Sequence, residues 1–227
     1  MKLTKLLKSL LLTVVVTVII ATTVNLNHAQ AQEITPGVDL YSTYVWRGVS
    51  YSGPSIQPYV ELSSGGFALG AWGSQGIDGS FTDGSSGFQE MDLYASYSFD
   101  FGLSLGVTDY YYPGGSFFED TGHAFEFNAG LALGDLSLSG NYIFAGEGSY
   151  GDDMYFEVGY SAGPANVFVG GGDGWHSSDP EEFAIVNIGI GTSKEIKITD
   201  SFSLPLSGAV ILNPDTEQFY IVAGISL

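Results

Sequence analysis

The chain alternates between apolar and polar residues from about Val38 to its last residue. In the clearest segment, residues 90–99, Met91, Leu93 and Phe99 alternate with Glu90 and Asp92 or with serines. Successive side chains of a strand point to opposite faces, so a period of two predicts β-strands rather than helices. Similar segments recur up to residue 227 and are separated by turn residues. This repetition is typical of a transmembrane β-barrel.

Turn signals divide the region after residue 31 into about 12 strands. Each strand with its connection then has about 16 residues, which suits the 9 to 11 residues that a spanning strand needs. We place the strands at 38–48, 55–63, 67–77, 88–99, 102–112, 123–133, 136–145, 153–162, 166–175, 182–191, 201–212 and 218–227. The predicted fold class is therefore all-β, a transmembrane antiparallel up-and-down β-barrel of about 12 strands, with about 10 as the alternative.

The connections alternate in length along the predicted barrel. Tight links such as 64–66 and 134–135 alternate with longer polar ones such as 78–87 and 113–122. Outer-membrane barrels have short periplasmic turns and longer external loops, so we expect both termini to be periplasmic. The link 192–200 is longer than a periplasmic turn should be.

The first 31 residues have the pattern of a secretory signal peptide. Three lysines precede an apolar run at 9–21, and Ala29-Gln30-Ala31 provides a small-residue cleavage site. The apolar run is shorter than the roughly 20 residues of a spanning helix. We predict a signal peptide at 1–31, one barrel domain at 32–227, and a location in the bacterial outer membrane.

Composition excludes several classes of partner. After residue 31 the chain has three Lys or Arg against 25 Asp or Glu, a formal charge of −22. Nucleic acid repels so acidic a protein, so we expect no nucleic-acid partner. Cysteine is absent, which excludes disulfides and thiolate metal ligands.

Two enzyme-like patterns lack the structural context that they require. Residues 102–106 match a nucleophile elbow but lie inside a strand, and residues 146–151 match a dinucleotide fingerprint but precede a strand. His123 and His176 are the two histidines after residue 31, and neither has a second histidine at short spacing. We expect His123 in an interfacial aromatic belt and His176 in a solvated loop, and we predict no enzyme activity, no cofactor and no metal site.

Acidic Gly-rich loops suggest partners outside the barrel. Carboxylates suit Ca²⁺, but no segment has the spacing of a known calcium loop, so we expect solvation and weak association with divalent cations. The predicted partners are outer-membrane lipid and lipopolysaccharide, with divalent cations at the loops. The oligomeric state is not predicted.

Charged residues at lumen-facing positions are the candidate functional residues. The alternation points Arg47 into the lumen at the outer end of the first strand. By the same alternation of side chains between the two faces, the carboxylates expected to point into the lumen are Glu61, Glu90, Asp92, Glu126, Asp153 and Glu157. A charge in a narrow barrel needs partners, so we expect Arg47 to be paired. The pattern fits both a charged constriction that selects ions and an ion-pair network that closes the barrel.

The predicted function is an outer-membrane porin-like channel for passive diffusion of small solutes or ions, with a preference for cations. The alternative is a closed structural or surface-interaction barrel with an ion-paired lumen. A membrane-embedded lipid hydrolase and a soluble periplasmic β-sandwich are weaker alternatives, since the first needs an activated nucleophile and the second would bury its apolar faces between two sheets.

Residues 37–48 resemble the opening strand of the TorF-type porin family of bacterial outer membranes. Further matches follow in order at 57–58, 70–74, 90–94, 112–114 and in the closing strand. The resemblance extends over nearly the whole chain after residue 31. It implies an outer-membrane barrel of porin type, in a family whose transported substrates are mostly unassigned.

Overall fold

The computed structural model describes residues 32–79, 87–114, 116–200 and 202–227. The predicted signal peptide and part of the predicted loop 78–87 lie outside these ranges. Within them, no helix is both long enough and apolar enough to cross a membrane.

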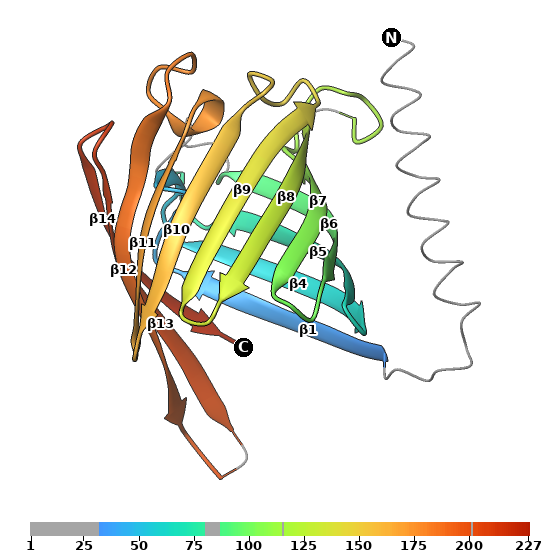
Figure 1. Ribbon diagram of the computed structural model, residues 1–227. Coiled ribbons are helices and arrows are strands. Elements are labelled where there is room, and N and C mark those ends of the chain that lie inside the picture. Colours follow the sequence, from blue (N-terminus) through green and yellow to red (C-terminus); the bar gives the residue numbers. More distant parts are fainter. Residues whose placement is uncertain (1–31, 80–86, 115, 201) are drawn as a thin grey trace. The chain divides into compact units, whose positions relative to one another are not determined.

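Twelve strands form a closed antiparallel barrel, and the short β2–β3 hairpin forms a separate sheet (Figure 1). The order around the barrel follows the chain, and β1 pairs with β14. The barrel strands are β1 (Gln32–Tyr41), β4 (Ser55–Ser64), β5 (Phe67–Gly76), β6 (Gln89–Ser98), β7 (Leu103–Tyr111), β8 (His123–Leu133), β9 (Leu136–Ala145), β10 (Met154–Ala162), β11 (Ala165–Gly172), β12 (Ala184–Lys197), β13 (Ser203–Asn213) and β14 (Gln218–Ser226). The predicted all-β class, the barrel and the number of 12 barrel strands are confirmed.

The barrel presents apolar side chains on its outer face. Along β10, Phe156 and Val158 are about half exposed, whereas Tyr155, directly before Phe156, is buried. Exposed apolar residues recur at outward positions of other strands, for example Leu93 and Phe127. A soluble monomer rarely exposes an apolar surface that runs around the whole molecule, whereas lipid requires one.

The first predicted strand, 38–48, is wrong. β1 ends at Tyr41, and the chain then forms β2 (Tyr44–Trp46) and β3 (Val49–Ser52). Arg47 and Gly48 connect them with φ angles of 50° and 81°. Positive φ at both central residues is the mark of a two-residue type I′ turn, which reverses the chain where a single strand was expected.

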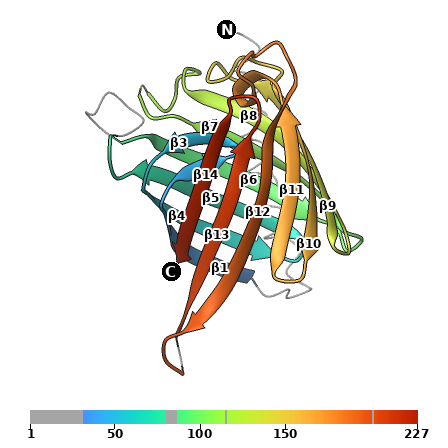
Figure 2. The same ribbon diagram turned by 90° about the vertical axis from the view of Figure 1, so that its left-hand side faces the viewer.

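Among the later strands, two boundaries differ from the prediction by three residues or more. β12 was expected to end at residue 191, but it pairs with β13 up to Lys197. Most of the long link at 192–200 is therefore strand, and the β12–β13 hairpin extends beyond the neighbouring short turns (Figure 2). β11 ends at Gly172 rather than 175, and the chain continues into a 3-10 turn, η1 (Gly174–His176).

The two faces of a strand should respond differently to substitution. We predict that Val158→Arg impairs folding, because Arg on the lipid face at the midplane of a barrel costs roughly 2–4 kcal/mol. Glu157→Gln, one residue away on the lumen face, should still fold. Heat-modifiable migration after refolding into lipid vesicles measures both. Normal assembly of Val158→Arg together with failure of Glu157→Gln would mean that the faces are reversed.

Candidate functional site

The β2–β3 hairpin lies inside the barrel, at the end that carries the longer loops. On one side, the Arg47 guanidinium binds Glu126 of β8. On the other side, the Asn213 side-chain amide of β13 donates a hydrogen bond of 3.0 Å to the Gly48 carbonyl oxygen. β8 and β13 are five positions apart in a ring of 12 strands, so these two consecutive residues contact nearly opposite walls. We call residues 44–52 the plug hairpin.

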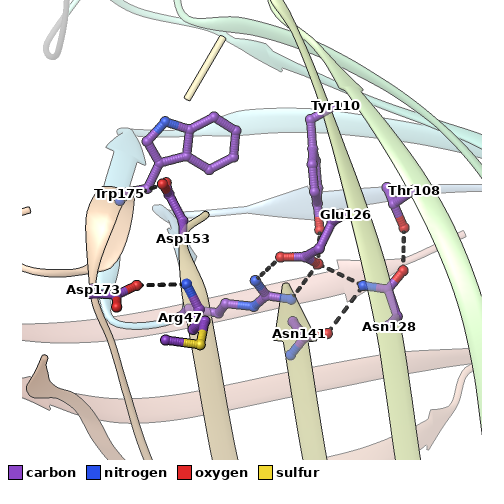
Figure 3. Close-up of polar contacts among 10 residues, drawn as sticks. Arg47, Thr108, Tyr110, Glu126, Asn128, Asn141, Asp153, Asp173 and Trp175 are labelled. Carbon is purple, nitrogen blue, oxygen red and sulfur yellow. Dashed lines mark hydrogen bonds and ion pairs between the residues drawn. The ribbon is translucent and has the colours of Figure 1, made fainter. Parts of the chain in front are cut away.

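Arg47 and Glu126 form a bidentate ion pair (Figure 3). Nη1 lies 2.6 Å from Oε2 and Nη2 lies 2.8 Å from Oε1. The Glu126 side chain is 1% exposed, and it also accepts hydrogen bonds from the Tyr110 hydroxyl and the Asn128 amide. Bidentate bonds between ionised groups are among the strongest polar contacts in proteins, so this pair fixes the turn of the plug hairpin to the wall.

Aromatic rings surround the ion pair. The Arg47 guanidinium carbon lies 4.2 Å from the ring centroid of Trp46 and 4.8 Å from that of Tyr155, distances suited to cation–π interactions. Trp46 also packs against Tyr110 and Trp175. These rings adjoin buried Ala124 and Ile143, so the lumen at this end has the character of a packed core.

Gly48 is required at the tip of the plug hairpin. Its φ is positive, and a Cβ at this position would overlap the carbonyl oxygen of Val186 on β12. A side chain here would therefore push the turn away from the wall.

The loop that contains η1 also folds back into the lumen. Asp153 accepts a hydrogen bond from the Trp175 backbone N–H, and Asp173 accepts one from the Met154 N–H (Figure 3). His176 packs between the rings of Trp46 and Tyr155, with centroid distances of 5.1 and 5.0 Å. The prediction of a solvated His176 is wrong, because this loop is anchored inward by Asp153.

Within the described part of the chain, neither ring nitrogen of His176 has a hydrogen-bond partner. Burial, with a smaller contribution from the Arg47 charge, lowers the pKa of His176 to about 3. The imidazole is thus neutral where it packs against the plug hairpin.

The other predicted lumen carboxylates are separate from Arg47. Glu61 accepts a hydrogen bond from the Tyr94 hydroxyl, and Glu157 accepts bonds from Tyr155 and Asn187. Two further members of the set lie on β6: Glu90 accepts a hydrogen bond from Tyr44 of the plug hairpin, and Asp92 is buried nearby. Among the described residues, Arg47 forms an ion pair with one of the six predicted carboxylates, Glu126.

A cavity of about 400 Å³, lined by both polar and apolar groups, adjoins the plug network. Its lining includes Thr108, Asn128 and Asn141, and Asn128 also donates to the Glu126 carboxylate. The other lining side chains are hydroxyl groups and small or apolar residues of β6 to β9, without a charged group. The barrel interior therefore changes, next to the ion pair, from packed aromatic rings to a cavity with an uncharged lining.

His123 begins β8 and packs against aromatic rings. Its ring is stacked on Phe125 and lies near Tyr111 and Phe117. Nδ1 lies 2.8 Å from an Asp109 oxygen, and Nε2 lies 2.9 Å from the Phe117 carbonyl oxygen. His123 is thus packed among aromatic rings and buried, and its place in an interfacial aromatic belt stays a prediction.

The plug hairpin and its anchors Tyr110, Asn128 and Asn213 were missed from the sequence. The available signal was Arg47-Gly48 between two short alternating segments, which fits a two-residue hairpin turn. No local signal marks Asn213, since its role depends on contact with a residue 165 positions earlier in the chain.

Protonation of His176 should loosen this end of the barrel. Because its folded-state pKa is lowered from 6.5 to about 3, the unfolded chain gains a proton between these values and the folded chain does not. Stability should fall as the pH drops from 6.5 towards 3, by up to about 1.4 kcal/mol per pH unit. We predict a shallower loss of unfolding temperature with acid for His176→Phe than for the wild type. Equal slopes would contradict this role.

Comparison with known proteins identifies one protein family and several solved structures of similar fold. A model of bacterial proteins of unknown function (Gcw_chp) matches residues 26–199. No curated protein matches the chain. The resemblance to TorF-type porins stays a prediction.

Among solved structures, two variants of the Rhodopseudomonas blastica porin match with 16% and 17% identity and TM-scores of 0.40 and 0.42. They cover 76% of this chain, which spans 55% of their length. The Salmonella typhi outer membrane phospholipase (OMPLA) dimer with bound calcium matches with 12% identity and a TM-score of 0.41. That match covers 88% of this chain and 92% of the phospholipase chain. Since the family model matches most of the sequence, the chain belongs to the Gcw_chp family of bacterial proteins of unknown function.

Proposed function

We propose that this chain is a porin-like barrel of the bacterial outer membrane whose resting lumen is closed by the plug hairpin. The bidentate bond between Arg47 and Glu126 carries this proposal, because it holds the hairpin turn across the lumen. The apolar outer face of the barrel supports a place in lipid, with lipopolysaccharide and divalent cations meeting its acidic loops. In this role the protein is not an enzyme and needs no cofactor.

The second candidate is a passive diffusion channel with a preference for cations. The cavity beside the plug supports it, because hydroxyl and amide groups in its lining can hydrate solutes. Inward carboxylates outnumber the single lumen arginine, which would attract cations over anions. Conduction in this case requires the plug hairpin to leave its position.

Conductance in planar bilayers distinguishes the two functions. If the plug hairpin closes the resting lumen, wild-type protein should give few or no conductance steps. Arg47→Ala should then give discrete, cation-selective conductance steps, with the open probability raised about tenfold or more. The reason is that losing one partner of a buried ion pair costs about 3–5 kcal/mol in the closed state. Glu61→Gln is the matched control, because it neutralises a lumen carboxylate that binds Tyr94 outside the plug hairpin.

Two other results would change the assignment. Steady wild-type conductance that Arg47→Ala leaves unchanged would contradict the plug and favour an open channel. If neither the wild type nor Arg47→Ala conducts although both proteins are folded, a permanently closed barrel would be favoured over a channel.

A further inference from the structure

Two acidic residues of β6 face the lumen, and neither has a cationic partner among the residues that the structure describes. Glu90 is 6% exposed and Asp92 is 8% exposed, and their spacing of two residues puts them on the same face of the strand. Among the described residues, the ion pairs of Arg47 and Lys197 are with Glu126 and Asp200. Two buried negative charges this close together are costly unless something neutralises them.

The hydrogen bonds of Asp92 are incomplete. Glu90 accepts a bond of 2.7 Å from the Tyr44 hydroxyl and another from the Tyr112 hydroxyl. Within the described chain, Asp92 Oδ1 has no partner, and neither does the hydroxyl of Ser74, which is 5% exposed. Buried polar atoms are rarely left in this state.

Ser74 is close to the two carboxylates because of the strand register. It lies on β5 directly opposite Glu90, and residues so paired have Cβ atoms about 4.5–5.5 Å apart on the same face. One patch of lumen wall therefore carries two carboxylates and a free hydroxyl. Oxygen atoms alone, with two negative charges, are the ligand set that suits Ca²⁺.

We propose that Glu90, Asp92 and Ser74 bind one hard divalent cation of the Ca²⁺ class, with water completing the coordination. Its charge balances the two carboxylates, and it gives the free oxygen atoms of Asp92 and Ser74 a partner. The cavity described above begins two residues further along the same face of β6, at Tyr94. The site goes beyond the proposed function, since it needs neither an open nor a closed barrel.

Terbium luminescence tests the site directly. Tb³⁺ takes the ligands that Ca²⁺ takes, and a nearby aromatic ring sensitises its emission. Trp72 lies opposite Asp92 in register, and Tyr44 donates to Glu90. Folded full-length protein, freed of divalent ions in detergent at pH 7, should give sensitised emission that saturates at one Tb³⁺ per chain for this site. Added Ca²⁺ should displace the bound Tb³⁺ and lower this emission.

Variants assign the bound ion to these residues. Asp92→Asn should lose one bound ion and its emission, and Ser74→Ala should weaken binding severalfold. Glu119→Gln neutralises an exposed loop carboxylate and is the matched control, which should bind as the wild type does. Ca²⁺ should also raise the unfolding temperature of the wild type, but not that of Asp92→Asn.

Three results would overturn the proposal. Absence of sensitised emission from folded wild type would mean that the carboxylates are neutralised by protons instead. An equal loss in Asp92→Asn and Glu119→Gln would assign the ion to the loops. If Asp92→Asn does not fold, unchanged affinity in Ser74→Ala would be the contradicting result.

Discussion

The ion pair between Arg47 and Glu126 is the interaction on which the barrel interior depends. Arg47 is the one Arg after residue 31, and its guanidinium is placed among buried groups where an unpaired charge would be costly. Glu126 meets it with both oxygens and is itself held by Tyr110 and Asn128. Because the adjacent Gly48 is bound to the opposite wall by Asn213, the hairpin turn is fixed from two sides.

This contact divides the lumen into two environments. A barrel of this size has room inside that side chains of the wall alone do not fill. On the loop side of the ion pair, Trp46 and Trp175 fill that room with aromatic packing. Next to it, Asn128 and Asn141 line a cavity that has no charged group in its lining. The same carboxylate of Glu126 thus belongs to the packed core and to the boundary of the cavity.

The sequence predicts the barrel well because its pattern is local. Alternation and turn residues place β8 and β9 at the residues where the structure has them, 123–133 and 136–145. The plug hairpin was mistaken for barrel strand because residues 44–46 alternate in the same way as a barrel strand does. Only the turn at Arg47 distinguishes the two, and that turn is held by contacts with strands far along the chain.

The candidate residues show the same limit. Parity places Glu90, Asp92 and Glu126 on the lumen side, where they are buried. The alternation does not predict which carboxylate pairs with Arg47, because β8 and the plug hairpin are brought together only when the barrel closes. His176 was misplaced for a related reason, as its burial depends on the Asp153 contact to the loop backbone.

A double-mutant cycle on Arg47 and Glu126 tests the central claim most directly. Unfolding free energies would be measured in detergent for Arg47→Met, Glu126→Gln and the double variant. Each single change should destabilise the barrel by about 3–5 kcal/mol, because it leaves the other charge buried and unpaired. The double variant should lose much less than the sum of the two. Additive losses would contradict the account, since they would mean that the two side chains do not act on each other.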